Sequence, residues 1–347
     1  LNLIKALLPL LFITQLSLAE GVVNFYNWAD YIGESTIRDF EEEYGIKVNY
    51  DEYDSSEIVE AKLLAGNSGY DLVVHSSMYS KRLMPLKIFH EIDPTKLSNF
   101  EKLDPMLMEM LDEIDSGNKI MIPYSYGSTG VSYDAKKIFA RDPNPPIGSA
   151  DMLYDADTIS KFADCGISIL DSPTDVIPQA LVYLGYDDSS KDPDELQEAE
   201  DLLHEARPYI KKFTSSTLLN DLANGDVCIA MSWAGDYATA SARAREAGKD
   251  IDLRYFVPEE GGLLWVDIIV IPKDAKNLEN AYLLLDYLLR PEVSADFVNL
   301  THYASPVPDA KPFIKEEVLN DTAVYPTPEI MDRLFFTEVD PPKYTRI

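Results

Sequence analysis

The stretch Val22–Ile32, VVNFYNWADYI, is the part of the sequence that decides the fold. It begins with apolar residues typical of a buried strand and ends on Trp28, Asp30 and Tyr31. Side chains alternate along a strand, so Trp28 and Asp30 are expected to point to the same side. An indole face beside a carboxylate suits an organic cation, because cation–π attraction and a charge-assisted hydrogen bond then act together. We therefore predict that this strand ends at a site for a cationic ligand.

Tryptophan and aspartate lie close together at two further places. The sequence holds three tryptophans, and each is followed two or three residues later by an aspartate. In a chain with 60 acidic residues such coincidences also arise by chance, so the pattern needs support from the rest of the sequence. The pairs are Trp28/Asp30, Trp233/Asp236 and Trp265/Asp267.

The net charge of −30 restricts the class of partner. Nucleic acids and anionic membranes are polyanions, so we expect neither to bind this chain. The long-range field of the protein favours cationic ligands instead. The alternative is that the acidity only keeps an exported protein soluble.

Residues 1–19, LNLIKALLPLLFITQLSLA, have the pattern of a secretory signal peptide. Lys5 supplies the positive charge, Ala6–Leu16 the apolar segment, and Ser17–Ala19 a cleavage site of small residues. The apolar run is too short for a membrane span. We expect a mature chain from Glu20 onwards in an exported compartment, most simply the periplasm of a bacterium.

Two cysteines, Cys165 and Cys228, follow in the mature chain. An oxidising compartment favours a disulfide between them, and two buried thiols are the alternative.

The first part of the mature chain alternates between strand and helix patterns. The helix pattern that opens at Asp54 is expected to turn Ile58, Ala61 and Leu64 or Ala65 inward. The resulting β-α-β-α-β order predicts a parallel sheet covered by helices, with ligands outside the carboxyl ends of its strands. Residues at such ends are Trp28, Asp30, Tyr31 and Ser76.

Two extended segments, residues 119–134 and 263–272, separate two such α/β sets. They predict an α/β protein of two lobes, each a mostly parallel sheet flanked by helices, with a ligand cleft between the lobes. The expected division assigns residues 20–128 and 266–302 to the first lobe, and residues 129–265 and 303–347 to the second.

Sequence motifs of hydrolases and nucleotide-binding proteins are absent, since the chain has no G-x-S-x-G, H-E-x-x-H, P-loop or G-x-G-x-x-G. The histidines are scattered, and we expect no metal and no other cofactor. Paired carboxylates beside aromatic residues leave a secreted glycoside hydrolase as the enzyme alternative. A third class is a binding module for an amino acid or a tyrosine-held metal.

Six segments together are similar to the polyamine-binding proteins of bacterial ABC importers. The resemblance implies a two-lobed periplasmic binding protein of the type II fold, which captures putrescine or spermidine and delivers it to an inner-membrane permease. It implies no enzyme activity, and we expect a monomer. The segments are FYNWADYI, GYDLVVHSS, GSTGVSYD, NDLANGDVCIAMSWAGD, WVDIIVIP and YLLRPEV.

The resemblance also implies a set of ligand-binding residues and a disulfide between Cys165 and Cys228. The aromatic residues of this set are Trp28, Tyr31, Trp233, Trp265 and Tyr303. Its polar residues are Asp30, Ser76, Asp175, Asp236 and Asp267.

The chain departs from the family pattern at several of these positions. Asp175 stands where relatives usually have Glu, Ala29 where they have Ser or Thr, and His75 where they often have Pro. Trp265 resembles spermidine-type members, whereas Asp236 resembles putrescine-type members. The preferred polyamine therefore stays open.

Overall fold

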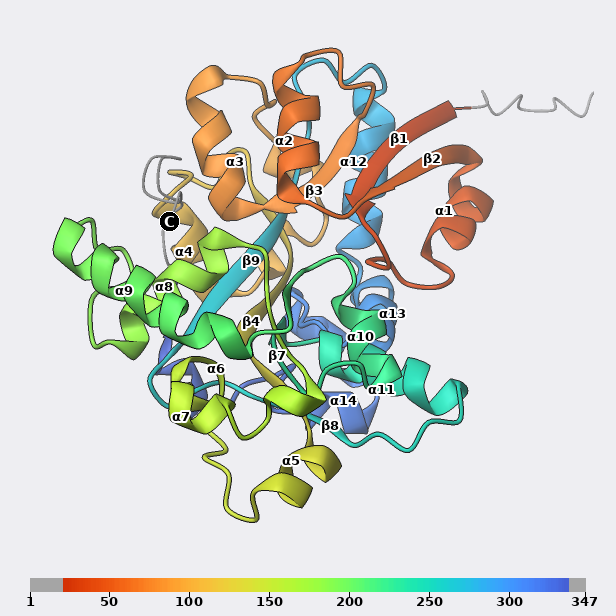
Figure 1. Ribbon diagram of the computed structural model, residues 1–347. Coiled ribbons are helices and arrows are strands. Elements are labelled where there is room, and N and C mark those ends of the chain that lie inside the picture. Colours follow the sequence, from red (N-terminus) through yellow and green to blue (C-terminus); the bar gives the residue numbers. More distant parts are fainter. Residues whose placement is uncertain (1–20, 337–347) are drawn as a thin grey trace, which may run out of the picture.

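The computed structural model describes residues 21–336, so the predicted signal peptide lies outside the described residues. Figure 1 shows the arrangement of the elements. The strands are β1 (Gly21–Trp28), β2 (Ile46–Tyr53), β3 (Leu72–Ser76), β4 (Ile122–Asp134), β5 (Ile167–Ile169), β6 (Lys212–Phe213), β7 (Ile229–Trp233), β8 (Leu253–Phe256), β9 (Gly262–Val270) and β10 (Leu334–Phe335).

The helices lie around these strands, and none within residues 21–336 combines the length and the apolar character that crossing a membrane requires. The α-helices are α1 (Thr36–Tyr44), α2 (Ser56–Leu64), α3 (Ser77–Leu83), α4 (Pro105–Asp112), α5 (Ala135–Arg141), α6 (Asp151–Tyr154), α7 (Ala156–Ile159), α8 (Pro173–Tyr183), α9 (Pro193–Ala206), α10 (Leu218–Asn224), α11 (Asp236–Glu246), α12 (Leu278–Leu288), α13 (Pro291–Thr301), α14 (Glu316–Leu319) and α15 (Pro328–Met331). The 3-10 helices are η1 (Met84–Leu86), η2 (Pro94–Lys96), η3 (Phe100–Lys102), η4 (Ala163–Cys165), η5 (Arg207–Tyr209) and η6 (Pro308–Phe313).

The strands form one continuous sheet, in which eight follow the order β2-β1-β3-β9-β4-β7-β5-β6, while β8 pairs with β4 and β10 with β9. Strands β1, β2 and β3 are parallel, as are β5, β6 and β7. Between these two parallel sets, β9 runs antiparallel to β3 and β4 runs antiparallel to both β9 and β7. The β-α-β order predicted from the sequence therefore holds in both halves of the sheet.

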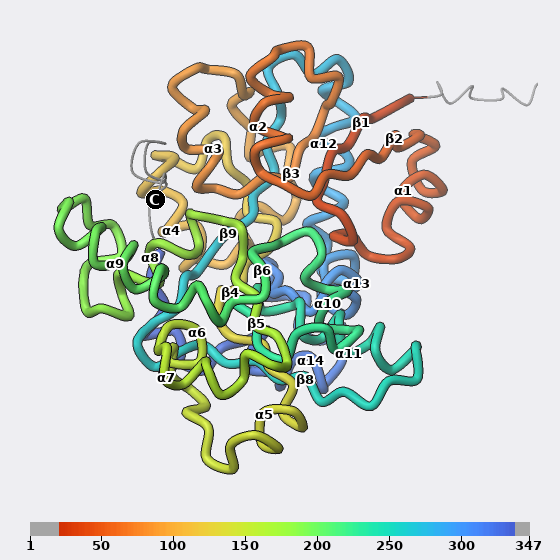
Figure 2. The backbone as a smooth tube through the Cα atoms, viewed as in Figure 1, coloured from red at the N-terminus to blue at the C-terminus, as the bar shows by residue number. Residues whose placement is uncertain are grey.

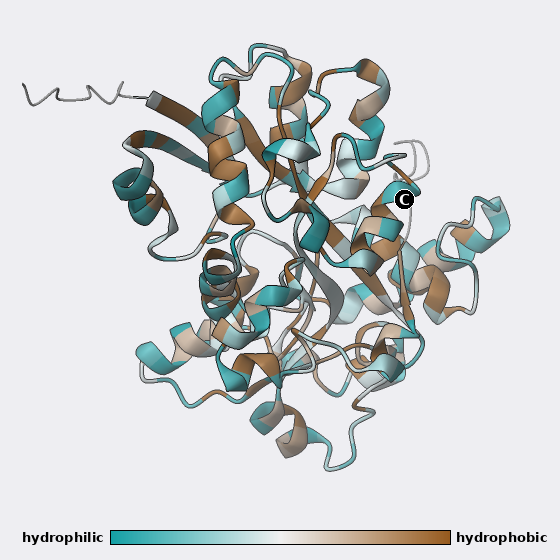
Figure 3. Ribbon diagram, turned by 180° about the vertical axis from the view of Figure 1, so that it is seen from behind, coloured by the Kyte–Doolittle hydropathy of each residue, from teal (hydrophilic) through white to brown (hydrophobic). Residues whose placement is uncertain are grey.

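Strands β4 and β9 carry the chain from one half of the molecule to the other (Figure 2). Both are buried along their whole length, because helices and loops of both halves cover them. Along β4, Tyr126 belongs to one hydrophobic core and Val131 to a second. We call the elements around the first core the first lobe and those around the second core the second lobe. Seen from behind, hydrophilic residues spread over the outer helices of both lobes (Figure 3).

The segment after Tyr303 packs differently from the predicted division of the chain. Its buried side chains, among them Ala304, Val307 and Val324, join the first core and not the second. The cause is a pairing with β4, in which the Tyr126 amide donates to the Ala304 carbonyl at 3.1 Å. A lobe boundary at residue 303 therefore conflicts with the packing of the described residues.

Helix α2 buries a different face from the one predicted. Val59 and Leu63 point inward, whereas Ile58 and Leu64 are 50% and 51% exposed. The helix carries apolar residues all round, so the sequence permits two inward faces, and packing against the sheet selects the Val59/Leu63 pair. The expected inward face of this helix was wrong.

The two cysteines form a disulfide, with Cα atoms of Cys165 and Cys228 5.6 Å apart. It joins η4 to the residue before β7 and so ties two neighbouring parts of the second lobe together. The disulfide alternative of the sequence analysis is confirmed.

Candidate ligand-binding site

The ten predicted ligand residues lie near the junction of the two lobes, and Asp30 is the exposed one among them. Trp28 ends β1, Ser76 ends β3 and Trp233 ends β7. Asp236 begins α11, and Asp267 lies on β9, which is shared by both halves of the sheet. The carboxyl ends of the strands therefore supply most of the candidate site, as the parallel topology requires.

Asp267 is the carboxylate of the first lobe. Its backbone pairs with Ser76 of β3 on one side and with Ser125 of β4 on the other. The residue is 8% exposed, and no hydrogen bond to its carboxylate comes from a side chain of residues 21–336. Burial raises the pKa of Asp267 to about 7, opposed by the neighbouring Tyr31 hydroxyl and Trp28 indole and reinforced by the charge of Asp175.

Aromatic rings surround this carboxylate. The Trp28 indole lies against Tyr53, with ring centroids 4.4 Å apart. Tyr303 contacts Tyr31 at 5.4 Å and Trp265 at 5.3 Å between centroids, both edge to face. The rings come from β1, the loop after it, β2, β9 and the segment after α13, so five parts of the chain build one aromatic wall.

Asp175 is the first carboxylate of the second lobe and lies in the first turn of α8. It accepts hydrogen bonds from Thr129 Oγ1 at 2.7 Å, Ser172 Oγ at 2.5 Å and Trp233 Nε1 at 3.2 Å. Burial raises its pKa, while these three hydrogen bonds lower it. The carboxylate therefore holds the Trp233 indole in place.

Asp236 is the second carboxylate of this lobe. It accepts a hydrogen bond from the Trp233 amide at 3.1 Å and another from the Tyr303 hydroxyl at 2.9 Å. Burial raises the pKa of Asp236 to about 6, although both donors and the charge of Arg243 lower it. Because Tyr303 packs against the first core, its hydroxyl connects the two lobes.

The structure does not bring Asp30 into this buried group. Its side chain is 66% exposed, and its carboxylate accepts a hydrogen bond from Arg243 Nη2 at 2.7 Å. The strand ends at Trp28, and Asp30 has a φ of 58°, so the chain turns before this residue and directs the carboxylate outward. Asp30 thus makes a surface ion pair between the lobes.

The three buried carboxylates have no basic partner. No lysine, arginine or histidine of the described residues forms an ion pair with Asp175, Asp236 or Asp267. Buried carboxylates without a cation are unfavourable, so they indicate a site that a cationic ligand completes. Among residues 21–336, no group of three acidic, histidine or cysteine side chains is arranged to hold a metal ion.

Three hydrogen-bond donors beside these carboxylates are buried and unused. Trp28 Nε1, Tyr31 Oη and Trp265 Nε1 have no hydrogen-bond partner within the described part of the chain. Buried donors are rarely left unpaired, so this wall also favours the presence of a bound molecule.

Sequence reasoning missed several residues of the site. Thr129, Ser172 and Ser125 support or flank the carboxylates, and the Tyr255 hydroxyl lies near Asp236 and bonds to the Ser128 carbonyl at 3.0 Å. Small hydroxyl residues and one of 21 tyrosines carry no local signal of this role. For Ser125 and Thr129 on β4, and for Tyr255 on the neighbouring β8, the position on or beside the crossing strand was the available clue, whereas Ser172 precedes α8.

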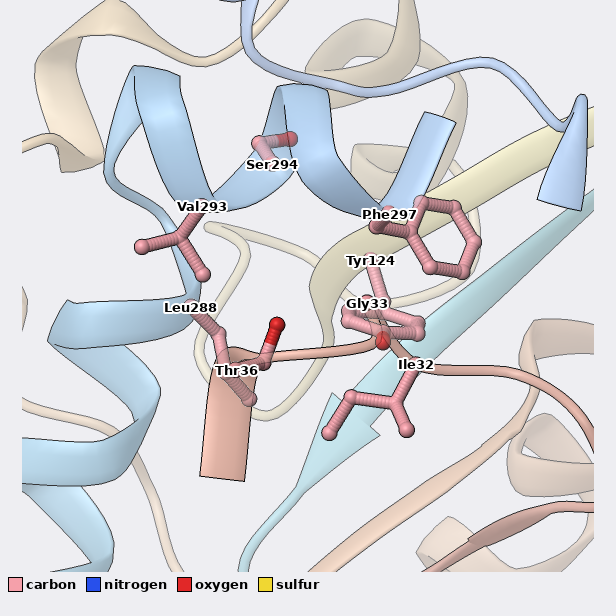
Figure 4. A pocket seen from close by; sticks show the side chains of 8 residues that line it. All are labelled: Ile32, Gly33, Thr36, Tyr124, Leu288, Val293, Ser294 and Phe297. Atoms are coloured by element: carbon pink, nitrogen blue, oxygen red, sulfur yellow. The ribbon is translucent and has the colours of Figure 1, made fainter. Parts of the chain in front are cut away.

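A small pocket lies behind the aromatic wall and is shown in Figure 4. It has room for about one water molecule, and its lining includes Gly33, Thr36, Tyr124 and Phe297. Tyr31 contacts both Tyr124 and Phe297, so these rings separate the pocket from the carboxylates.

Fold and site together define a two-lobed solute-binding protein of the periplasmic type II class. The family model described as bacterial extracellular solute-binding protein matches residues 35–326. The chain belongs to this family of bacterial extracellular solute-binding proteins. The predicted fold and protein class are confirmed, and the glycoside hydrolase alternative has no support.

Relatives with known ligands agree with this assignment. The putrescine-binding periplasmic protein SpuD of Pseudomonas aeruginosa is 40% identical over 315 residues, 90% of this chain and 86% of that protein. The putrescine-binding periplasmic protein PotF of Escherichia coli is 40% identical over 334 residues, 96% of this chain and 90% of that protein. Among solved structures, the spermidine/putrescine substrate-binding protein PotD of Streptococcus pneumoniae is similar with a TM-score of 0.78 and 30% identity, over 94% of this chain and 95% of that chain.

Proposed function

We propose that the protein captures a polyamine, putrescine or spermidine, between its lobes in the periplasm and delivers it to the permease of an ABC importer. The observation that carries the proposal is the group of three buried carboxylates without a basic partner, enclosed by indole and phenol rings. A polyamine offers both features that this group requires, namely ammonium ions for the carboxylates and methylenes for the rings.

The ligand-binding residues of the proposal come from both lobes, so the ligand favours closure of the lobes over it. Asp30 is left out of the set because it is exposed and paired with Arg243. The proposed set is Trp28, Tyr31, Ser76, Asp175, Trp233, Asp236, Trp265, Asp267 and Tyr303.

The free energies involved indicate that both the rings and the carboxylates have to contribute to binding. Burying the four methylenes of putrescine contributes about 3 kcal/mol, whereas micromolar affinity requires about 8 kcal/mol. The difference has to come from ammonium–carboxylate and cation–π contacts after desolvation and ordering are offset. An amino acid ligand would need a positive side chain for its carboxylate, and the proposed set contains none.

The relatives and the charge of the chain support the rest of the proposal. The names of the relatives describe them as periplasmic and as binding putrescine or spermidine. The net charge of −30 disfavours nucleic acid as a partner. We propose that the protein acts as a monomer, which size-exclusion chromatography with light scattering tests.

Calorimetric titration of the ligand-stripped mature protein tests the function. We expect saturable one-to-one binding of putrescine or spermidine and no heat from glutamate or maltose. Asp236→Ala should weaken binding by more than about 2 kcal/mol, because a buried ammonium loses its partner. Asp187→Ala, which removes an exposed carboxylate of the second lobe, is the matched control. Folded protein that binds no amine would overturn the proposal.

A further inference from the structure

The charges of the site do not balance with a diamine. Asp175, Asp236 and Asp267 are 7%, 6% and 8% exposed, so three potential negative charges lie in the interior. The amines of putrescine and spermidine resemble lysine in their pKa and carry two and three positive charges at neutral pH. A bound diamine therefore leaves one buried negative charge without a partner, and this is costly.

No other charged group of the described residues supplies the missing positive charge. Arg243 of α11 is the cation whose charge acts on Asp236, but it is partly exposed and pairs with Asp30. The other titratable groups that face the carboxylates are phenols, whose pKa burial raises, so they stay neutral. They are Tyr31, Tyr53, Tyr79, Tyr124, Tyr154, Tyr255 and Tyr303.

The three carboxylates also differ in how many hydrogen bonds they can still accept. An ionised carboxylate has about four acceptor positions. From the described residues, the carboxylate of Asp267 accepts no side-chain hydrogen bond, that of Asp236 accepts two hydrogen bonds, and that of Asp175 accepts three. Asp236 and Asp175 together keep about three, which matches the three donors of one terminal ammonium. These counts leave the two carboxylates of the second lobe room for one terminal ammonium between them.

We propose that the site binds a diamine together with one proton on its carboxylates, and binds a triamine without that proton. The inference rests on the proposed function and specifies the charge state of the same site. The proton comes from the buffer and balances the third carboxylate, and the third ammonium of spermidine replaces it. The raised pKa values of Asp236, about 6, and Asp267, about 7, support a proton held near neutral pH.

Titration calorimetry at pH 7 in buffers of small and large ionisation enthalpy measures the protons exchanged on binding. We expect spermidine to release about one proton more than putrescine, whatever the protonation of the empty site. By linkage, the ratio of spermidine to putrescine affinity then rises about tenfold per pH unit between pH 6 and 8. Equal proton numbers for both ligands would overturn the inference while leaving the proposed function intact.

The variant Asp175→Asn tests whether Asp175 supplies the third negative charge, which a diamine leaves unbalanced. The amide can keep all three hydrogen-bonded neighbours, because its Oδ1 still accepts from Thr129 and Trp233, and its Nδ2 can donate to the Ser172 hydroxyl. We expect the difference in released protons to disappear and spermidine to lose at least tenfold in affinity relative to putrescine. Asp187→Asn, the matched control, should keep the one-proton difference. The wild-type measurement decides the inference even if Asp175→Asn does not fold.

Discussion

Asp267→Asn should change the closure of the lobes and the affinity for amines in opposite directions. In this structure, where hydrogen bonds such as those from Tyr303 to Asp236 and from Arg243 to Asp30 join the lobes as expected of a closed form, burial raises the pKa of Asp267 from 3.8 to about 7. One pKa unit corresponds to about 1.4 kcal/mol, so Asp267 opposes closure by about 4 kcal/mol at pH 8, where it stays charged, and by about 2 kcal/mol at pH 5, where it takes up a proton on closure. The closed form holds the proton more tightly than the open form, in which the carboxyl returns to water. Closure without ligand therefore becomes less favourable as the pH rises from about 4 through 7.

The neutral asparagine removes this cost. We expect the ligand-free wild type to shift toward the open form by about 30-fold between pH 5 and 8, which is the difference of about 2 kcal/mol between the two costs at about 1.4 kcal/mol per factor of ten. The ligand-free variant should stay more closed at pH 8 and lose most of this pH dependence. Its affinity for putrescine should fall by about 2 kcal/mol or more, or about 30-fold, because an ammonium loses its charged partner.

Small-angle X-ray scattering of ligand-free protein at both pH values measures closure through the radius of gyration, and calorimetry measures the affinity. Asp187→Asn, which removes an exposed charge, should match the wild type in both assays. If the variant is as open as the wild type at pH 8, or if it binds putrescine as tightly as the wild type does, Asp267 does not bear the buried charge of the site.

Three further changes test separate parts of the structure. Trp265→Phe should alter the ratio of putrescine to spermidine affinity in calorimetry, and an equal effect on both ligands would reject a role in selection. Arg243→Gln removes the exposed pair with Asp30, worth up to about 1 kcal/mol, so stopped-flow dissociation of putrescine should quicken by at most about fivefold. Reduction of the Cys165–Cys228 disulfide, which closes a loop of 63 residues, should lower the free energy of unfolding in urea by about 4 kcal/mol, and a loss below 1 kcal/mol would contradict the entropy argument.

The sequence allowed most of the site to be predicted because strand ends in a parallel sheet meet at one edge. Trp28, Ser76 and Trp233 each follow a short apolar run, and Asp236 opens the next helix. The chain order alone therefore places them together. Asp30 lies outside the buried group because the alternation rule assumes extended backbone, whereas β1 ends at Trp28 and Asp30 has a φ of 58°. A left-handed aspartate has no clear signal in a single sequence.

Local sequence patterns could not predict the packing between distant parts of the chain. The segment after Tyr303 was assigned to the second lobe, yet its pairing with β4 at Tyr126 places it on the first core. Contacts between residues this far apart depend on the folded topology and not on periodicity. The support of Asp175 by Thr129 was missed for the same reason, since the two residues are 46 positions apart.

Helix α11 explains how ligand binding can control closure. Three of its side chains reach from the second lobe to elements of the first: Asp236 accepts from Tyr303, Tyr237 donates to Asp321, and Arg243 pairs with Asp30. Hydrogen bonds of this kind contribute about 1 kcal/mol each, and the exposed ion pair contributes no more. Their sum of about 3 kcal/mol is no larger than the cost of about 4 kcal/mol for charging Asp267 alone at pH 8. These three contacts of α11 do not by themselves offset the cost of an empty, fully charged site, whereas an ammonium that neutralises the carboxylates removes that cost, so we expect the ligand to favour the closed form.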